Sequence, residues 1–142
     1  ERLRLEAYRR LGGARAVEEV EALAAELADR YGPPPPPVRN LLVLAGVRAQ
    51  ATAVGLTEIV CFGGRARLGP VDDLPESRQV RLDRLYPGAI WKRPDRTLLV
   101  PLPTDAADLP GWLTELLTAI LDAPAAPTLP APGRPDLRRA AS

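Results

Sequence analysis

The sequence contains no histidine and one cysteine, and these shortages exclude most catalytic and metal-binding chemistry. Histidine is the usual general base near neutral pH and the commonest zinc ligand. Cys61 therefore has no imidazole to activate it, and without a second cysteine it forms no internal disulfide. Because Cys61 lies in the apolar run I-V-C-F, the sequence predicts a buried, unreactive thiol. Neither G-x-x-x-x-G-K-[ST] nor G-x-G-x-x-G occurs, so no phosphate-binding loop for ATP is predicted.

Methionine, long apolar runs and a charge excess are also missing. Without methionine, Glu1 is not a natural start, and we expect the chain to be part of a longer polypeptide. No apolar run approaches the roughly 20 residues that span a bilayer, and no signal peptide is visible, which favours a cytoplasmic protein with no membrane partner. The net charge is +1, whereas proteins that bind phosphate backbones usually carry a marked basic excess. Direct nucleic-acid binding is therefore not expected.

The sequence does contain strong signals for where helices begin and end. Apolar spacing predicts helices over residues 1–11, 16–31 and 38–54. Gly32 supplies a left-handed cap, Pro33 forbids continuation, and Pro37 suits the first turn of the next helix. The proline run is thus predicted to be a rigid elbow between two helices. The helix over 38–54 is apolar nearly all round, so we expect it at the centre of the domain, with Leu41 among its buried residues.

The helix over 16–31 is predicted to have an apolar face and a flat acidic face. Val17, Val20, Leu23, Ala24, Leu27 and Tyr31 form the apolar face. Opposite lie Ala22 and Ala25, with Glu26 and Asp29 on a shared face three residues apart. Arginines of another domain could approach these carboxylates closely, while from the residues alone a solvated acidic face is the alternative.

The second half of the chain predicts a small sheet with two more helices. Strands are expected over 57–62 and 65–68 around a Gly63-Gly64 turn, and over 89–92 and 97–100. Helices are expected from Pro75 to about Tyr86, where a strand is the alternative, and over 109–121. The predicted fold class is α+β, with three N-terminal helices, a small antiparallel sheet and two further helices. Residues 1–122 form this domain, and residues 123–142 form a Pro/Ala-rich disordered tail.

Three segments carry a resemblance to a known family. Residues 2–10 read R-L-R-L-E-A-Y-R-R, residues 26–33 read E-L-A-D-R-Y-G-P, and residues 41–56 read L-L-V-L-A-G-V-R-A-Q-A-T-A-V-G-L. They resemble the C-terminal domain of the transcription-repair coupling factor (Mfd) family. Residues 80–87 and 97–101 are similar to the form that this domain takes in high-GC bacteria.

The resemblance implies a non-catalytic regulatory domain of an ATP- and Mg²⁺-dependent DNA translocase, with no cofactor of its own. It implies docking on the N-terminal UvrB-like module of the same polypeptide, so that the UvrA-binding surface is masked until stalled RNA polymerase is engaged. The matching positions place Glu26 and Asp29 at this intramolecular interface, with Arg30, Ala22 and Ala25 as neighbours.

Other interpretations of the residues remain open at this point. Arg78, Arg81, Arg84, Arg93 and Arg96 could form a nucleic-acid-binding patch, and the proline elbow or the tail could bind a protein partner. Asp72, Asp73 and Glu76 are the one close carboxylate group that suggests a metal site, but they lack a metal-ligand spacing and are typical of a turn before a helix.

Overall fold

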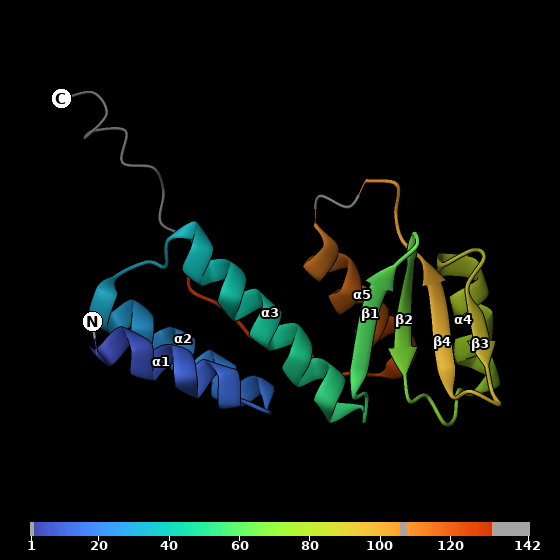
Figure 1. Ribbon diagram of the computed structural model, residues 1–142, viewed down its shortest axis with the longest axis horizontal. Coiled ribbons are helices and arrows are strands. Elements are labelled where there is room, and N and C mark those ends of the chain that lie inside the picture. The colour runs from blue at the N-terminus through green and yellow to red at the C-terminus, as the bar shows by residue number, and fades with distance from the viewer. Residues whose placement is uncertain (1, 106–107, 132–142) are drawn as a thin grey trace.

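The computed structural model describes residues 2–105 and 108–131, and it shows an α+β fold, as the sequence predicts (Figure 1). A helical unit comprises α1 (Arg2–Gly13), α2 (Val17–Tyr31) and α3 (Pro36–Ala53). A sheet unit follows, with β1 (Glu58–Phe62), β2 (Arg65–Gly69), α4 (Glu76–Leu85), β3 (Ile90–Lys92), β4 (Thr97–Pro101) and α5 (Leu109–Leu121). Among the described helices, none is both long enough and apolar enough to span a membrane.

The helical unit is held together by the predicted apolar face of α2. Val20, Leu23 and Ala24 of this face are buried against Leu42 and Ala45 of α3 and residues of α1. Burying one such large apolar side chain contributes about 1.5–3 kcal/mol, so this face accounts for the packing of the three helices. Tyr31, which the same spacing assigns to the core, is 41% exposed because it is the last residue of α2.

The elbow between α2 and α3 begins at the predicted glycine, which has a positive φ, but it is shorter than expected. Gly32 has a φ of 80°, and its N–H donates to the Ala28 carbonyl at 2.8 Å. α3 begins at Pro36, two residues before the predicted Val38, with Pro35 as its N-cap. The first turn of a helix leaves its N–H groups without intrahelical partners, so prolines there lose no helical hydrogen bond.

α3 lies at the centre of the molecule, as predicted, and contributes to two separate cores. Ala45 and Ala49 pack into the helical unit, whereas Val47 and Ala51 pack against the sheet unit. The expected burial of Leu41 is wrong: Leu41 is 46% exposed and Leu44 is 53% exposed. The two cores cover opposite sides of α3, and Leu41 and Leu44 lie on an exposed side between them.

The strands form one antiparallel sheet in the order β1-β2-β4-β3, because β2 pairs with β4 and joins the two predicted strand pairs. Gly63 and Gly64 have φ values of 62° and 75°, as a two-residue hairpin turn with two left-handed positions requires. The inner face buries Leu68, Leu98 and Val100 against α4 and α5. The helix predicted after Pro75 is confirmed over Glu76–Leu85.

The segment after α5 does not behave as the predicted tail over its first part. Residues 123–131 have no helix or strand, but they run back along the helical unit (Figure 1). Gln50 donates to the Pro124 carbonyl at 2.9 Å, Arg39 donates to the Pro130 carbonyl at 2.6 Å, and the Thr128 N–H donates to Glu21 at 2.9 Å. We call residues 124–131 the strap. The disordered tail expected from Ala123 is therefore corrected for residues 123–131, and residues 132–142 lie outside the described residues.

The strap is ordered because it satisfies buried groups. Gln50 is fully buried within the apolar centre of α3, and it also accepts from the Thr114 hydroxyl of α5 at 3.3 Å. The strap carbonyl completes its hydrogen bonding, and an unpaired buried amide would cost about 1–3 kcal/mol. Pro127 is buried and Leu129 packs on the helical core. Composition alone underestimates how ordered such a segment is. A proline-rich backbone is already stiff, so it loses little conformational entropy on folding and needs few contacts to be ordered.

Gly46 makes room for the strap, which gives a first prediction. A Cβ atom built at Gly46 would lie 2.7 Å from Cγ of Pro127. Replacing Gly46 with valine should displace the strap and lower the free energy of unfolding in urea by about 1–3 kcal/mol, the usual cost of overpacking. Gly12→Val in α1, where an added Cβ meets no atom within 4 Å, is the matched control. If Gly46→Val lowers the free energy of unfolding equally in a chain that ends before Pro127, the clash is not with the strap.

Candidate functional site

The exposed face of α2 is the strongest candidate for a binding site among the described residues. Glu18, Ala22, Ala25 and Asp29 are exposed and follow one another at helical spacing. We call these four residues the α2 strip. Its two alanines keep the helix backbone accessible at close range, and its two carboxylates have no ion-pair partner among the described residues. The predicted Ala22, Ala25 and Asp29 therefore share one solvent-facing surface.

Glu26 is placed differently from the prediction. Its carboxylate lies 2.8 Å from the Arg10 guanidinium of α1 and 3.5 Å from the Arg30 guanidinium one turn along α2. Because residues three apart are separated by about 60° around a helix, Glu26 turns from the α2 strip towards α1. Helical spacing within α2 predicts that Glu26 shares the Asp29 surface, but it gives no sign of the pairing with Arg10, which belongs to another helix.

The two expected interface carboxylates therefore differ in their electrostatic surroundings. Glu26 is 34% exposed and already neutralised by two guanidinium groups, of which Arg30 is itself a predicted interface residue. Asp29 is exposed and unneutralised. An incoming arginine would meet Asp29 directly, whereas at Glu26 it would have to compete with Arg10. The site thus centres on Asp29, with Glu26 and Arg30 at its rim.

The predicted arginine patch is largely engaged within the domain. Arg78 pairs with Asp122 and donates to the Ala119 carbonyl at the end of α5, and Arg81 donates to the same carbonyl at 3.0 Å. These two guanidinium groups complete hydrogen bonds that the last turn of α5 leaves open. Arg96 pairs with Asp72, and the Arg93 guanidinium lies 4.7 Å from the ring centre of Trp91. Of the five, Arg84 alone has no such contact with another described residue.

These internal contacts predict weak DNA binding. A labelled duplex titrated with the chain at low salt should show no shift, because the domain would have to break its own ion pairs to bind phosphates. Arg84→Ala should change nothing, and Arg78→Ala should reduce stability through the lost cap of α5. A salt-dependent shift that Arg84→Ala weakens would instead support the arginine patch.

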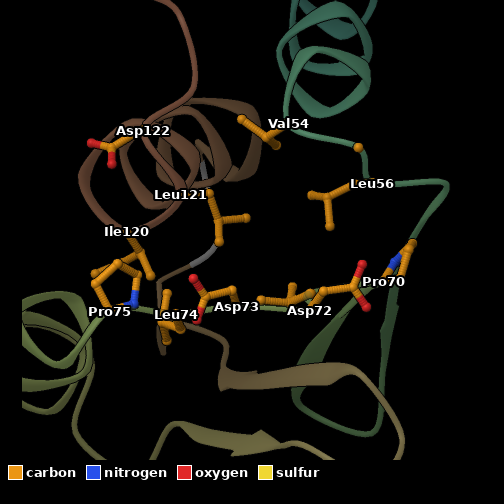
Figure 2. A pocket seen from close by; sticks show the side chains of 12 residues that line it. Val54, Leu56, Pro70, Asp72, Asp73, Leu74, Pro75, Ile120, Leu121 and Asp122 are labelled. Carbon is orange, nitrogen blue, oxygen red and sulfur yellow. The ribbon is translucent and has the colours of Figure 1, made fainter.

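The carboxylate group at Asp72 forms one side of an open pocket of about 270 Å³ (Figure 2). Asp72, Asp73 and Asp122 line it, whereas Glu76 does not. Figure 2 shows the Asp122 carboxylate turned away from those of Asp72 and Asp73. The hydrogen bond from Arg96 holds the pKa of Asp72 below its ordinary value. Across the part of the chain that is described, no three His, Cys, Asp or Glu side chains are placed to hold a metal ion.

The prediction that Cys61 is buried is wrong. Cys61 is exposed, although partial burial raises the pKa of its thiol. Its strand, β1, lies at the edge of the sheet and has a neighbouring strand on one side only. The apolar composition of β1 therefore does not mean that its side chains are buried. A run such as I-V-C-F indicates a strand, but the position of that strand in the sheet depends on pairings between distant residues.

The elements that carry the α2 strip match a known family. The family model described as the TRCF domain matches residues 1–78, which span the helical unit, the β1–β2 hairpin and the start of α4. The chain belongs to the TRCF domain family. All five predicted interface residues lie within the match.

Similar proteins agree with this assignment. The transcription-repair-coupling factors of Mycobacterium bovis and Mycobacterium tuberculosis are 38% identical over 134 residues, which cover 87% of this chain and 11% of each relative. The Escherichia coli factor is 39% identical over 56 residues, covering 39% of this chain and 5% of the relative. The chain therefore spans about a tenth of the length of the mycobacterial relatives. The mycobacterial relatives fit the high-GC bacterial source expected from the sequence.

The TRCF fold is also confirmed by a solved structure. The crystal structure of the C-terminal domain of a transcription-repair coupling factor matches with a TM-score of 0.63 at 18% identity. The match covers 84% of this chain and 77% of the solved chain. It therefore includes most of both the helical unit and the sheet unit.

Proposed function

We propose that this TRCF domain is a non-catalytic autoinhibitory domain of a transcription-coupled DNA repair translocase. It docks through the α2 strip on the N-terminal UvrB-like module of the same polypeptide and masks the surface that recruits UvrA. Engagement of stalled RNA polymerase then releases it. The proposal rests on family membership together with the α2 strip, which offers an unpaired carboxylate on a face of small residues.

The chemistry of the α2 strip suits a contact that must form and release. Alanines at positions 22 and 25 allow close approach of a partner, but they bury little apolar area, so the contact depends on charge. Exposed ion pairs are individually weak, at about 0.2–1 kcal/mol. Tethering within one polypeptide compensates, because it raises the effective concentration of the partner to roughly millimolar. Polymerase engagement thus has only a weak contact to overcome.

The direct experiment measures binding of this chain to the separate UvrB-like module. Asp29→Arg should replace attraction by repulsion and abolish binding without changing the fold, because Asp29 has no ion-pair partner among the described residues to lose. Asp83→Arg, the same charge change at an exposed position of α4, is the matched control. Equal binding by the two variants would remove the α2 strip from the proposal.

Glu26→Arg should behave differently from Asp29→Arg. It would place a third guanidinium group between Arg10 and Arg30, so it should weaken the packing of α1 on α2 as well as docking. Circular dichroism during heating separates these effects. Only Asp29→Arg should lose docking at an unchanged melting temperature.

A further inference from the structure

The two edges of the sheet differ in how well they are protected against pairing with a further strand. β3 is three residues long, contains Lys92 and is followed closely by Pro94, which are the usual means of preventing another strand from pairing with an edge. β1 is five residues long and has neither lysine nor proline. Within the described elements, β2 alone contacts the backbone of β1 closely. β1 therefore offers an open template for a further strand.

Hollows on both sides of β1 match the alternation of a strand. On the α3 side, a groove of about 560 Å³ is lined by Ile59, Leu44, Val47 and Leu113. On the opposite face of the sheet, a hollow of about 430 Å³ is lined by Val60, Phe62 and Leu99. Phe62 is 85% exposed, which is unusual for a large apolar side chain without a partner. Alternate side chains of an added strand would enter the two hollows in turn.

The charges around β1 indicate the chemistry of the added strand. Arg15 and Arg48 line the groove, and Arg65 and Arg67 line the hollow. One carboxylate, Glu58, opposes them, and it lies 2.6 Å from Arg67. A second copy of this chain would bring the same arginines together. Nucleic acid is also disfavoured, because Phe62 is the one aromatic ring among aliphatic side chains in the hollow, so successive bases have no stacking platform.

We propose that β1 is a second interaction site, separate from the α2 strip, which binds an extended acidic segment of a partner protein as a fifth strand. Main-chain hydrogen bonds to β1 provide affinity, and each hollow selects an apolar side chain on its own face of the added strand. Carboxylates at the remaining positions meet the arginines. This inference stands independently of autoinhibitory docking.

Cys61 provides a direct measurement, because it is the sole cysteine and lies in β1. The probe is a short synthetic peptide that repeats Leu-Leu-Glu-Glu, so that each face of the strand carries both leucine and glutamate. It is added while a disulfide reagent reacts with the thiol. The reaction should slow hyperbolically with peptide concentration, about elevenfold at roughly ten times the Kd if the bound chain does not react. A peptide with lysine for glutamate, and one with alternate backbone nitrogens methylated, should each have no effect.

Substitutions test whether the slowing of the Cys61 reaction depends on the two hollows. Phe62→Ser should weaken the peptide effect, and Val60→Ser serves as a second variant if the first fails to fold. Val80→Ser, at a 64% exposed position of α4, should leave it unchanged. Failure of the acidic peptide to slow the reaction, equal slowing by the lysine peptide, or stronger protection by oligothymidylate would each overturn the proposal. So would slowing that follows protein concentration without peptide, because it would identify a second copy as the occupant.

Discussion

We expect Asp29→Arg, made in the longer polypeptide, to raise the affinity for UvrA by roughly 5- to 150-fold. This range corresponds to about 1–3 kcal/mol, the usual coupling between linked sites. The reason is the proposed competition: if docking of the TRCF domain and binding of UvrA exclude one another, weakening the first strengthens the second. Affinity measured by titration of labelled UvrA gives the result directly.

The same substitution tests the competition in a second arrangement. The isolated TRCF domain, added in trans to the UvrB-like module, should reduce UvrA binding, and its Asp29→Arg variant should lose this effect. Asp83→Arg should retain it, because that position lies on α4 rather than on the α2 strip. If UvrA affinity is the same for wild type and both variants, Asp29 belongs to a merely solvated face.

Truncation after Ala123 should lower the melting temperature by about 10 °C. The truncation keeps the hydrogen bond from the Ala123 N–H to the Leu117 carbonyl, so α5 retains its end. It removes the Pro124 carbonyl that accepts from the Gln50 amide, and it exposes the surface that Pro127 covers. Together these changes cost about 3 kcal/mol. For a domain of this size, 1 kcal/mol corresponds to roughly 3–4 °C.

Truncation after Ala131 is the matched control for the strap. It preserves the contacts of residues 124–131 with the rest of the described chain, and we expect its melting temperature to stay within about 2 °C of the full chain. Adding Gln50→Leu to the shorter truncation should restore part of the loss, because the unpaired buried amide is then removed. A shorter truncation as stable as the full chain would show that the strap contributes nothing.

The features predicted correctly from the sequence depend on neighbouring residues. Helical spacing located the packed face of α2, Gly32 and the prolines located the elbow, and Gly63-Gly64 located the hairpin turn. Each requires only a local backbone preference, such as a left-handed glycine or a residue without an N–H group. The α+β class followed from the order of these elements.

The features missed depend on residues far apart in the chain. The pairing of Glu26 with Arg10 requires the crossing of α1 over α2, and the exposure of Cys61 requires the strand order. Predicting the strap requires knowing that Gln50 is buried beside it. One signal was available, since Gln50 is a lone amide within the apolar centre of α3 and such a group needs a partner.

The most direct test of autoinhibitory docking is a charge exchange across the proposed interface. Binding of the TRCF domain to the UvrB-like module is measured for Asp29→Arg, for arginine-to-glutamate changes on the module, and for both together. If Asp29 meets an arginine, each single change weakens binding and the combination restores it, giving a coupling energy clearly different from zero. Losses that simply add would contradict a direct contact between Asp29 and the module.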